Sequence, residues 1–429
     1  MNARRPSVMY VAAMLPKRSE TFVYRELLGL RDAGWDVSAL SVRPPERDLG
    51  SDMLDDLAGE AAVVYRDVPK MLLGAASEVA RHPRSTLRTL SHVAKLAVGG
   101  DDITGLRRAK LVWQALGVLG AAESARKKGV EHIHAHMAHV PASIAMLLAL
   151  QLDVPFSFTG HAVDIFSQRT LLRTKLRRAT FCACISEWHR GFYQELLEKA
   201  SGAGLEEHRL PVVRCGVNVN EFTPPASRPP GPLRIVTVGR LIEKKGFDLL
   251  LRALAAQPAD TPAYECTIMG GGEEADALAK LCTELGLDDR VTFTGAVPNT
   301  EVRERLQAAD LFVLPCRIAK SGDRDGIPVV LMEAMASGVP VIAGDIPSIR
   351  ELVRDDQSGL LVAPESEGEL GTAIGRLVGN DDVRDRLARG GRARVLEEFS
   401  LEHNVARIAK SICQAHGVDF EAHTPEERS

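Results

Sequence analysis

Residues 224–232 read PPASRPPGP, and this proline-rich stretch divides the chain into two halves of similar design. On both sides of it, apolar runs of strand length alternate with amphipathic helical patterns. Such alternation, with strands that are apolar almost throughout, is typical of parallel sheets covered by helices on both faces. The sequence therefore predicts an α/β protein with two doubly wound domains and a stiff linker between them.

The alternation also sets the expected boundaries. Ser400 is a suitable N-cap for a last helix. The predicted organisation is a first domain at 1–223, a linker at 224–232, a second domain at 233–399 and a polar tail at 417–429. The expected strands cover 8–15, 37–40, 132–136, 155–160, 181–186, 211–217, 233–239, 264–270, 291–297, 310–315, 340–344 and 359–362.

Bulk composition excludes several classes of protein. A chain of 429 residues suits two domains, and a net charge of -4 argues against a nucleic-acid binder. The seven cysteines are scattered without a CxxC pair, which argues against a zinc site or a disulfide framework and predicts a cytoplasmic protein. The apolar run near the N-terminus is too short for a signal peptide, and no run reaches the length of a membrane span.

The segment VGRLIEKKGF, residues 238–247, follows a strand and places two cations in the next loop. At the carboxyl end of a parallel strand, Arg240 and Lys245 can clamp a diphosphate, the first through its fork and the second as a point charge. A solvated basic loop would have the same composition, so the segment alone leaves both interpretations open.

The segment IMGGGEE, residues 268–274, brings three glycines directly after another strand. Glycine permits close approach of the backbone to a ligand, which makes Gly271 a candidate for donor binding. The spacing is not that of a GxGxxG fingerprint, so a nicotinamide enzyme is not favoured. A glycine-rich loop without function is the alternative.

Residues 325–333 read DGIPVVLME, with an acid at each end. We expect Asp325 in a loop and Glu333 within the following helix, whose N-terminus near Gly326 and Ile327 offers backbone N–H groups to an anion. Glu333 can accept hydrogen bonds from the vicinal hydroxyls of a ribose, and Asp325 from those of a sugar. The alternative is a surface turn, but an acid in so apolar a run is costly without a function.

In the first half, His161 and Asp164 follow the expected strand 155–160, at the end where ligands of parallel sheets bind. PKRSETF, residues 16–22, joins the first strand to the first helix, and Ser19, as its N-cap, Glu20 and Thr21 are expected at the same end. Together with Asp164, these three residues are the candidates for the acceptor side of the site. A purely structural histidine is the alternative for His161.

Alternate histidines in HIHAHMAH, residues 132–139, share one face of the expected strand and look at first like a metal site. The neighbouring acid, Glu131, would point to the other face, and no cysteine is near. We therefore predict no metal site here.

Taken together, these segments resemble a retaining GT-B glycosyltransferase of the family-4 type over nearly the whole chain, closest to the branch that builds bacterial exopolysaccharides such as colanic acid. That family carries an acid–seven residues–acid motif, usually with two glutamates, which reads Asp325 and Glu333 here. The resemblance implies two Rossmann-like domains that face each other across a cleft, with helix 400–416 crossing back to the first domain.

The resemblance also implies roles for individual residues. Arg240 and Lys245 would hold the donor diphosphate, Glu333 the ribose, and Asp325 the donor sugar, with His161 beside the transferred sugar. The sequence differs from the family's usual pattern where Pro328 replaces a glycine and removes one N–H, and where residues 17–20 replace paired glycines.

The expected activity is transfer of a sugar from a nucleotide-diphosphate sugar to a hydroxyl of a glycan or lipid-linked glycan, with retention and without a metal or other cofactor. A sugar-nucleotide epimerase on the same fold and a catalytically silent sugar-nucleotide-binding protein are the alternatives. We expect no nucleic-acid partner.

Basic residues cluster in the stretches 81–110 and 169–178, with leucines interleaved in the first. Such stretches can lie on anionic lipid, which would make the protein peripheral at the inner face of the cell membrane. A solvated helix face would look the same in sequence.

Overall fold

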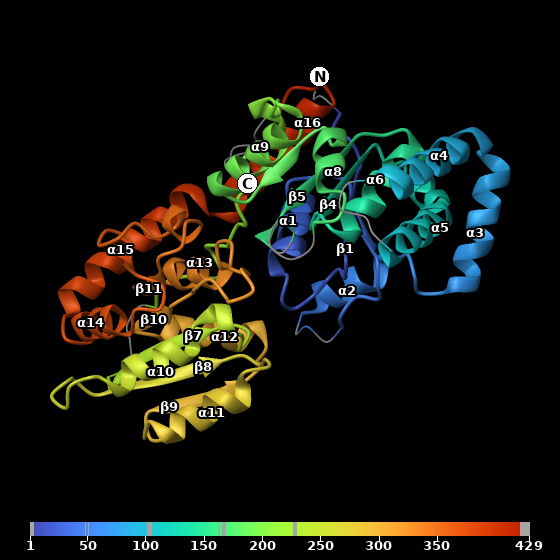
Figure 1. Ribbon diagram of the computed structural model, residues 1–429. Coiled ribbons are helices and arrows are strands. Elements are labelled where there is room, and N and C mark those ends of the chain that lie inside the picture. The colour runs from blue at the N-terminus through green and yellow to red at the C-terminus, as the bar shows by residue number, and fades with distance from the viewer. Residues whose placement is uncertain are drawn as a thin grey trace. The chain divides into compact units, whose positions relative to one another are not determined.

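The computed structural model describes residues 4–47, 49, 51–100, 105–162, 164, 169–225 and 230–420. The chain forms two compact units. Unit 1 consists of residues 1–214 and 404–429, and unit 2 consists of residues 215–403 (Figure 1). Each unit has its own sheet and its own apolar core and is described separately below.

Unit 1 is built on a six-stranded parallel sheet in the order β3-β2-β1-β4-β5-β6. Helices lie on both faces of this sheet, as the continuously apolar strands predict (Figure 1). Its strands are β1 (Val8–Ala12), β2 (Val37–Ser41), β3 (Ala62–Val63), β4 (His132–His136), β5 (Phe156–Gly160) and β6 (Cys182–Cys184). Its helices are α1 (Thr21–Asp32), α2 (Asp52–Glu60), α3 (Val68–Arg81), α4 (Pro83–Gly99), α5 (Leu106–Lys127), α6 (Val140–Leu152), α8 (Leu172–Arg178), α9 (Glu187–Ser201) and the short η1 (Glu207–Arg209).

Unit 2 repeats the design with a six-stranded parallel sheet in the order β12-β11-β10-β7-β8-β9. Its strands are β7 (Leu233–Val238), β8 (Tyr264–Met269), β9 (Val291–Gly295), β10 (Leu311–Leu314), β11 (Val341–Gly344) and β12 (Leu360–Val362). Its helices are η2 (Glu243–Lys245), α10 (Phe247–Ala255), α11 (Ala275–Glu284), α12 (Asn299–Ala308), α13 (Val329–Ala336), η3 (Ile349–Glu351), α14 (Glu367–Val378) and α15 (Asp381–Glu398).

In both sheets the strand order reverses beside the first strand of the unit, between β1 and β4 and between β7 and β10. Ligands of open parallel sheets bind outside the carboxyl ends of the strands at this switch point. The loops that follow these four strands are therefore the places to look for a site.

The C-terminal helix α16 (Leu401–Ala415) begins where the sequence predicts, because the Ser400 hydroxyl accepts a hydrogen bond from the N–H of His403. From Asn404 onward the chain belongs to unit 1. The expected return of this helix to the first domain is thus confirmed.

Two expectations differ from the structure. Residues 211–217 form isolated bridges to Cys184 and Ser400 rather than a strand. The division between the units lies after Arg214, ahead of the predicted first-domain end at 223, because Val217 and Phe222 pack into the core of unit 2. The prolines at 224 and 225 therefore follow the boundary instead of forming it.

Among the described residues, no helix is both long enough and apolar enough to cross a membrane.

Candidate active site

In unit 2, a cluster of charges lies past the carboxyl ends of β7 and β10. The Lys245 ammonium lies 2.7 Å from Asp325 Oδ2, and the Lys244 ammonium lies 3.3 Å from Asp325 Oδ1. Lys244 is also 3.0 Å from Asp323 Oδ2. The predicted residues Lys245 and Asp325 therefore form an ion pair. Lys244 and Asp323 belong to the same cluster, although no role was predicted for them from the sequence.

The charges of this cluster support one another. Burial alone raises the pKa of Asp325, but Lys245 and Lys244 outweigh it and hold the pKa below its ordinary value. Burial lowers the pKa of Lys245, and Asp325 more than offsets this, so the pKa of Lys245 is raised. Both groups are consequently charged at neutral pH.

Arg240 follows β7 and is exposed, close enough for its charge to oppose that of Lys245. Within the described part of unit 2, its guanidinium has no ion-pair partner. Arg240 is thus the cation of this cluster that is free to meet an anion.

Glycines allow the loops of this cluster to approach each other closely. A Cβ on Gly270 would lie 1.9 Å from the carbonyl oxygen of Gly239, and one on Gly246 would lie 2.2 Å from that of Pro315. Both residues also have positive φ, which favours glycine. Gly271, the predicted donor-binding glycine, is exposed, and a Cβ there would meet nothing within 4 Å.

Hydrogen bonds to Ser348 and Cys316 hold the loop after β10 in place. The Ser348 hydroxyl lies 3.0 Å from the carbonyl oxygens of both Asp325 and Gly326, and the Cys316 thiol donates to Asp325 Oδ2 over 3.3 Å. The acid therefore has a defined orientation before any ligand binds.

Helix α13 begins later than the sequence predicts. Pro328 is its N-cap and Val329 its first residue, whereas the expected start lay near Gly326 and Ile327. Proline fixes φ and has no N–H, so the helix starts after it. Ile327 and Glu333 are buried, and Glu333 lies on α13 as expected.

In unit 1, His161 follows β5 and belongs to a buried hydrogen-bonded network. Its Nε2 lies 3.2 Å from Nδ1 of His136, whose Nε2 lies 3.0 Å from Oε1 of Glu26. The Tyr10 hydroxyl donates to the same carboxylate oxygen over 2.7 Å. Burial, and then the neighbouring His136, lower the pKa of His161 well below its usual value, so the ring is neutral.

Asp164 holds the loop that carries His161. Its carboxylate accepts the N–H groups of His161, over 2.8 Å, and of His139, over 3.1 Å, and it is fully buried. Burial raises the pKa of Asp164 to about 6. These contacts make Asp164 a structural support for the loop of His161, and its place on the acceptor side stays a prediction.

The entry to α1 also differs from expectation. The helix starts at Thr21 with Glu20 in the N-cap position, so Ser19 is not its N-cap. Glu20 forms an ion pair with Lys17. A ligand contact for Ser19, Glu20 or Thr21 stays a prediction.

The three histidines of β4 do share one face, and they meet an acid that the sequence does not reveal. Glu26, His134 and His136 bring one ligand atom each within 4.8 Å of one another. Each of these atoms has a hydrogen-bond partner within the protein, since His134 Nε2 lies 2.9 Å from Thr159 Oγ1. The only sequence signal for Glu26 is an acid between apolar residues of an amphipathic helix, and its partner is 110 positions away.

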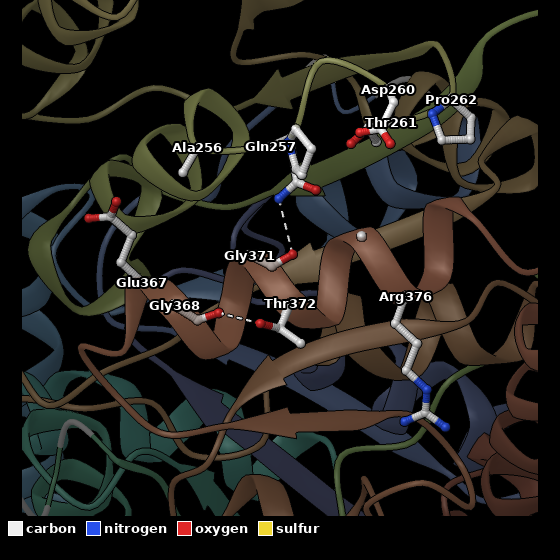
Figure 2. Close-up of a pocket in the computed structure, with 12 residues that line it drawn as sticks. Ala256, Gln257, Asp260, Thr261, Pro262, Glu367, Gly368, Gly371, Thr372 and Arg376 are labelled. Atoms are coloured by element: carbon white, nitrogen blue, oxygen red, sulfur yellow. Dashed lines mark hydrogen bonds between the residues drawn. The ribbon is translucent and has the colours of Figure 1, made fainter.

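The hollow shown in Figure 2 lies in unit 2, away from these residues. It has a volume of about 530 Å³ and is lined by the loop after α10 and by one face of α14. Gln257 crosses it to donate to the carbonyl of Gly371 over 3.0 Å. None of the predicted site residues lines it, so its size gives no argument for catalysis.

The basic stretch 81–110 coincides with exposed apolar side chains. On α4, Leu87 is 71% and Val98 82% exposed, and Leu90 lies on the same side of the helix. In the stretch 169–178, by contrast, Lys175 is fully buried and donates to the carbonyls of Ala138, His139 and Thr170. Lys175 therefore cannot meet a lipid headgroup.

The chain is similar to known glycosyltransferases. Residues 219–394 match the family described as glycosyl transferases group 1. WcaL of Escherichia coli (strain K12), whose name assigns it to colanic acid biosynthesis as a glycosyltransferase, is 29% identical over 82% of this chain and 85% of its own length. A GDP-mannose-dependent alpha-(1-6)-phosphatidylinositol monomannoside mannosyltransferase of Mycolicibacterium smegmatis is 30% identical over 58% of this chain and 67% of its own length.

Among solved structures, HepE of Anabaena in complex with UDP-glucose has a TM-score of 0.68 at 17% identity, covering 95% of this chain and 99% of HepE. This likeness concerns the fold, which is that of the GT-B glycosyltransferases.

Proposed function

Because the chain belongs to the glycosyl transferases group 1 family and has the GT-B fold, we propose that it transfers a sugar from a nucleotide-diphosphate sugar to an acceptor hydroxyl with retention at the anomeric carbon. The supporting observation is the charge cluster of unit 2, in which Lys245 is held by Asp325 beside a free Arg240.

This cluster suits a leaving diphosphate. As the glycosidic bond breaks, negative charge grows on the phosphate oxygens, and fixed cations stabilise that charge without reorganising. Arg240 offers a planar fork of donors, and the Lys245 ammonium has three hydrogens, of which Asp325 engages one. In this proposal the two side chains supply the positive charge that a divalent ion supplies elsewhere.

The remaining residues are assigned around that diphosphate. Glu333 accepts from the donor ribose, Asp325 accepts from the donor sugar, and Gly271, Gly326 and Ile327 bring backbone close to the phosphates. His161 contacts the transferred sugar. We propose attack of the acceptor hydroxyl from the face of the leaving group, with its proton passing to the departing phosphate oxygen.

Names of relatives suggest the acceptor class. WcaL is named for colanic acid biosynthesis, and the mycobacterial relative for a phosphatidylinositol mannoside. We therefore propose that the acceptor is a glycan or lipid-linked glycan in polysaccharide biosynthesis.

The test of the reaction is a mass-spectrometric screen of nucleotide sugars, beginning with UDP-glucose and GDP-mannose, with and without candidate glycan acceptors. The proposal expects nucleoside diphosphate and a longer glycan, and NMR of the product should show the anomeric configuration of the donor. A new sugar nucleotide formed without any acceptor would identify an epimerase instead. Nucleotide binding without turnover of any donor would identify a silent binder.

The exposed surface of helix α4 favours an acceptor that lies at a membrane. Thr86, Thr89 and Val93 face the core, while Leu87 and Val98 face outward. The helix carries three cations, Arg84, Arg88 and Lys95, and no acid. Arg88 pairs with Asp153, which leaves Arg84 and Lys95 beside the exposed apolar stripe. A stripe of this kind, on a helix that has cations and no acid of its own, matches an anionic lipid surface. We propose that α4 lies on such a surface.

Co-sedimentation with phosphatidylglycerol vesicles tests this surface. We expect binding that weakens with salt and that is lost in Leu87→Glu/Val98→Glu. The control is Leu396→Glu, since Leu396 is an exposed leucine of α15 in unit 2 and should not matter. Equal binding to phosphatidylcholine vesicles, or no binding at all, would contradict the assignment.

A further inference from the structure

His161 is the end of a line of hydrogen bonds that begins at Tyr10 in strand β1. The line runs from the Tyr10 hydroxyl to Glu26, then to His136 and then to His161. These four residues come from β1, α1, β4 and the loop after β5. All four side chains are buried, so water does not compete for these contacts.

The chemistry of the groups fixes where the protons lie. A carboxylate only accepts hydrogen bonds, so His136 donates to Glu26 from Nε2. With His136 neutral, its other nitrogen carries a lone pair, so Nδ1 accepts. The donor that faces it, over 3.2 Å, is Nε2 of His161.

His161 is therefore protonated on Nε2 and carries its lone pair on Nδ1, because burial keeps the ring neutral. Over the residues that the structure describes, Nδ1 has no hydrogen-bond partner of its own. The Phe22 ring lies 4.6 Å from the His161 ring, centroid to centroid, and limits its rotation. The histidine thus presents a fixed acceptor atom.

We propose that Glu26 and His136 are positioning residues that hold His161 in its Nε2–H tautomer, so that Nδ1 accepts a hydrogen bond from a hydroxyl of the bound sugar. This inference rests on the proposed function for the sugar contact, but not for the tautomer. Tyr10 contributes by donating to the same oxygen of Glu26, which keeps the carboxylate in place.

A second branch of the network provides the control. The Ser157 hydroxyl lies 2.7 Å from His132 Nε2 and 2.8 Å from His134 Nδ1, on the neighbouring strand and equally buried. Neither contact involves His136 or His161. Ser157→Ala therefore removes two buried hydrogen bonds from the same sheet without touching the line to His161.

The direct test is 15N NMR of protein labelled on histidine, with the resonance of His161 assigned by its loss in His161→Gln. The wild type should show His161 protonated on Nε2. Glu26→Met, which frees His136 to adopt either tautomer, should give a mixture, and the conservative Glu26→Gln should lie between the two. Ser157→Ala should leave the His161 signal unchanged.

Three results would overturn the proposal: a wild-type His161 protonated on Nδ1, no change in Glu26→Met, or an equal change in Ser157→Ala. Zinc that stays bound stoichiometrically after dialysis and is lost in Glu26→Met would also overturn it, since Glu26 and His136 would then be ligands. None of these readouts requires turnover, so they are independent of whether the proposed transfer is correct.

Turnover measures the consequence. With the donor found by the screen, Glu26→Met should lower kcat about 10-fold with little change in KM, as the loss of a supporting partner typically does. Ser157→Ala should stay within about 2-fold of wild type. A tautomer that shifts as expected while kcat stays constant would contradict the sugar contact alone.

Discussion

The two units carry polar clusters at corresponding places in their sheets, but the two clusters differ in charge. Each unit places a polar cluster past the carboxyl ends of a parallel sheet, near the point where its strand order reverses. In unit 2 the cluster is charged: the pKa of Lys245 is raised and that of Asp325 is lowered. In unit 1 it is built from imidazoles, and burial lowers the pKa of His161 well below its usual value.

The electrostatic character of each cluster limits what it can bind. Opposite charges at 2.7 Å keep each other ionised despite burial, which preserves positive charge for a phosphate. Burial and the neighbouring imidazoles keep His161 neutral, and a neutral ring suits the hydroxyl groups of a sugar. Under the proposed function, the charged cluster of unit 2 suits the diphosphate and the neutral cluster of unit 1 suits a sugar hydroxyl.

Removal of Lys245 should have the largest effect. Without its ammonium the leaving diphosphate loses a fixed cation, and we expect Lys245→Ala to reduce turnover on the order of 100- to 1,000-fold. Steady-state kinetics with the donor found by the screen measures this loss. The control is Lys280→Ala, whose lysine is exposed on α11 and pairs with Glu284. Similar turnover in Lys245→Ala and Lys280→Ala would show that the charge cluster of unit 2 does not stabilise the leaving diphosphate.

Acid should unfold unit 1 before unit 2. Burial lowers the pKa of His132 and of His189 to about 3. Between pH 6.5 and 3 the unfolded chain takes up protons that the folded unit cannot, so stability falls as pH falls. The loss is about 2 kcal/mol for each of these histidines at pH 5. Asp164, with its pKa raised to about 6, acts in the opposite direction and offsets part of the loss.

The Lys245–Asp325 pair of unit 2 responds differently at the same pH. The pKa of Asp325 is lowered, so its contribution is present above the unfolded value and is lost only as pH falls through the folded value. All three tryptophans lie in unit 1, so their fluorescence reports that unit alone, while hydrogen exchange in β7 and β10 reports unit 2. Loss of protection in unit 2 at the higher pH would reverse the comparison.

Neutralising single acids of the unit 2 cluster should lower turnover less than removing Lys245 does. These variants separate the role of Asp325 from that of Asp323. Asp325→Asn removes the partner of Lys245 and the proposed sugar contact, and we expect turnover to fall about 10-fold. Asp323→Asn affects only the contact to Lys244 and should change turnover by less than about 2-fold. Asp325→Asn with full turnover would show that the sugar-side assignment is wrong while leaving that of Glu333 intact.

The fold was predictable because its signal is local. Runs such as HIHAH at 132–136 and LRIVTV at 233–238 reveal strands through their own composition. The exception, residues 211–217, is equally apolar, but it is placed where only isolated bridges form. An apolar run shows that a segment is buried, and the tertiary context decides whether it pairs.

The site was predictable only one motif at a time. Arg240, Lys245 and Asp325 each follow a strand, which marks them in sequence. The pairing of Lys245 with Asp325 depends on β7 lying beside β10, and the contact between Glu26 and His136 depends on α1 reaching β4. Neither neighbour relation is encoded in local patterns, so Glu26 and the supporting role of Asp164 became visible only in the folded chain.

The central claim is that unit 2 binds the diphosphate of a sugar nucleotide through its own cations. Calorimetric titration of UDP and GDP in the presence of EDTA tests it most directly, with wild type, Lys245→Ala and Lys280→Ala compared. The account predicts binding that persists in EDTA, weakens at least about 10-fold in Lys245→Ala and is unchanged in Lys280→Ala. Binding that vanishes in EDTA, or that is equal in the two variants, would contradict it.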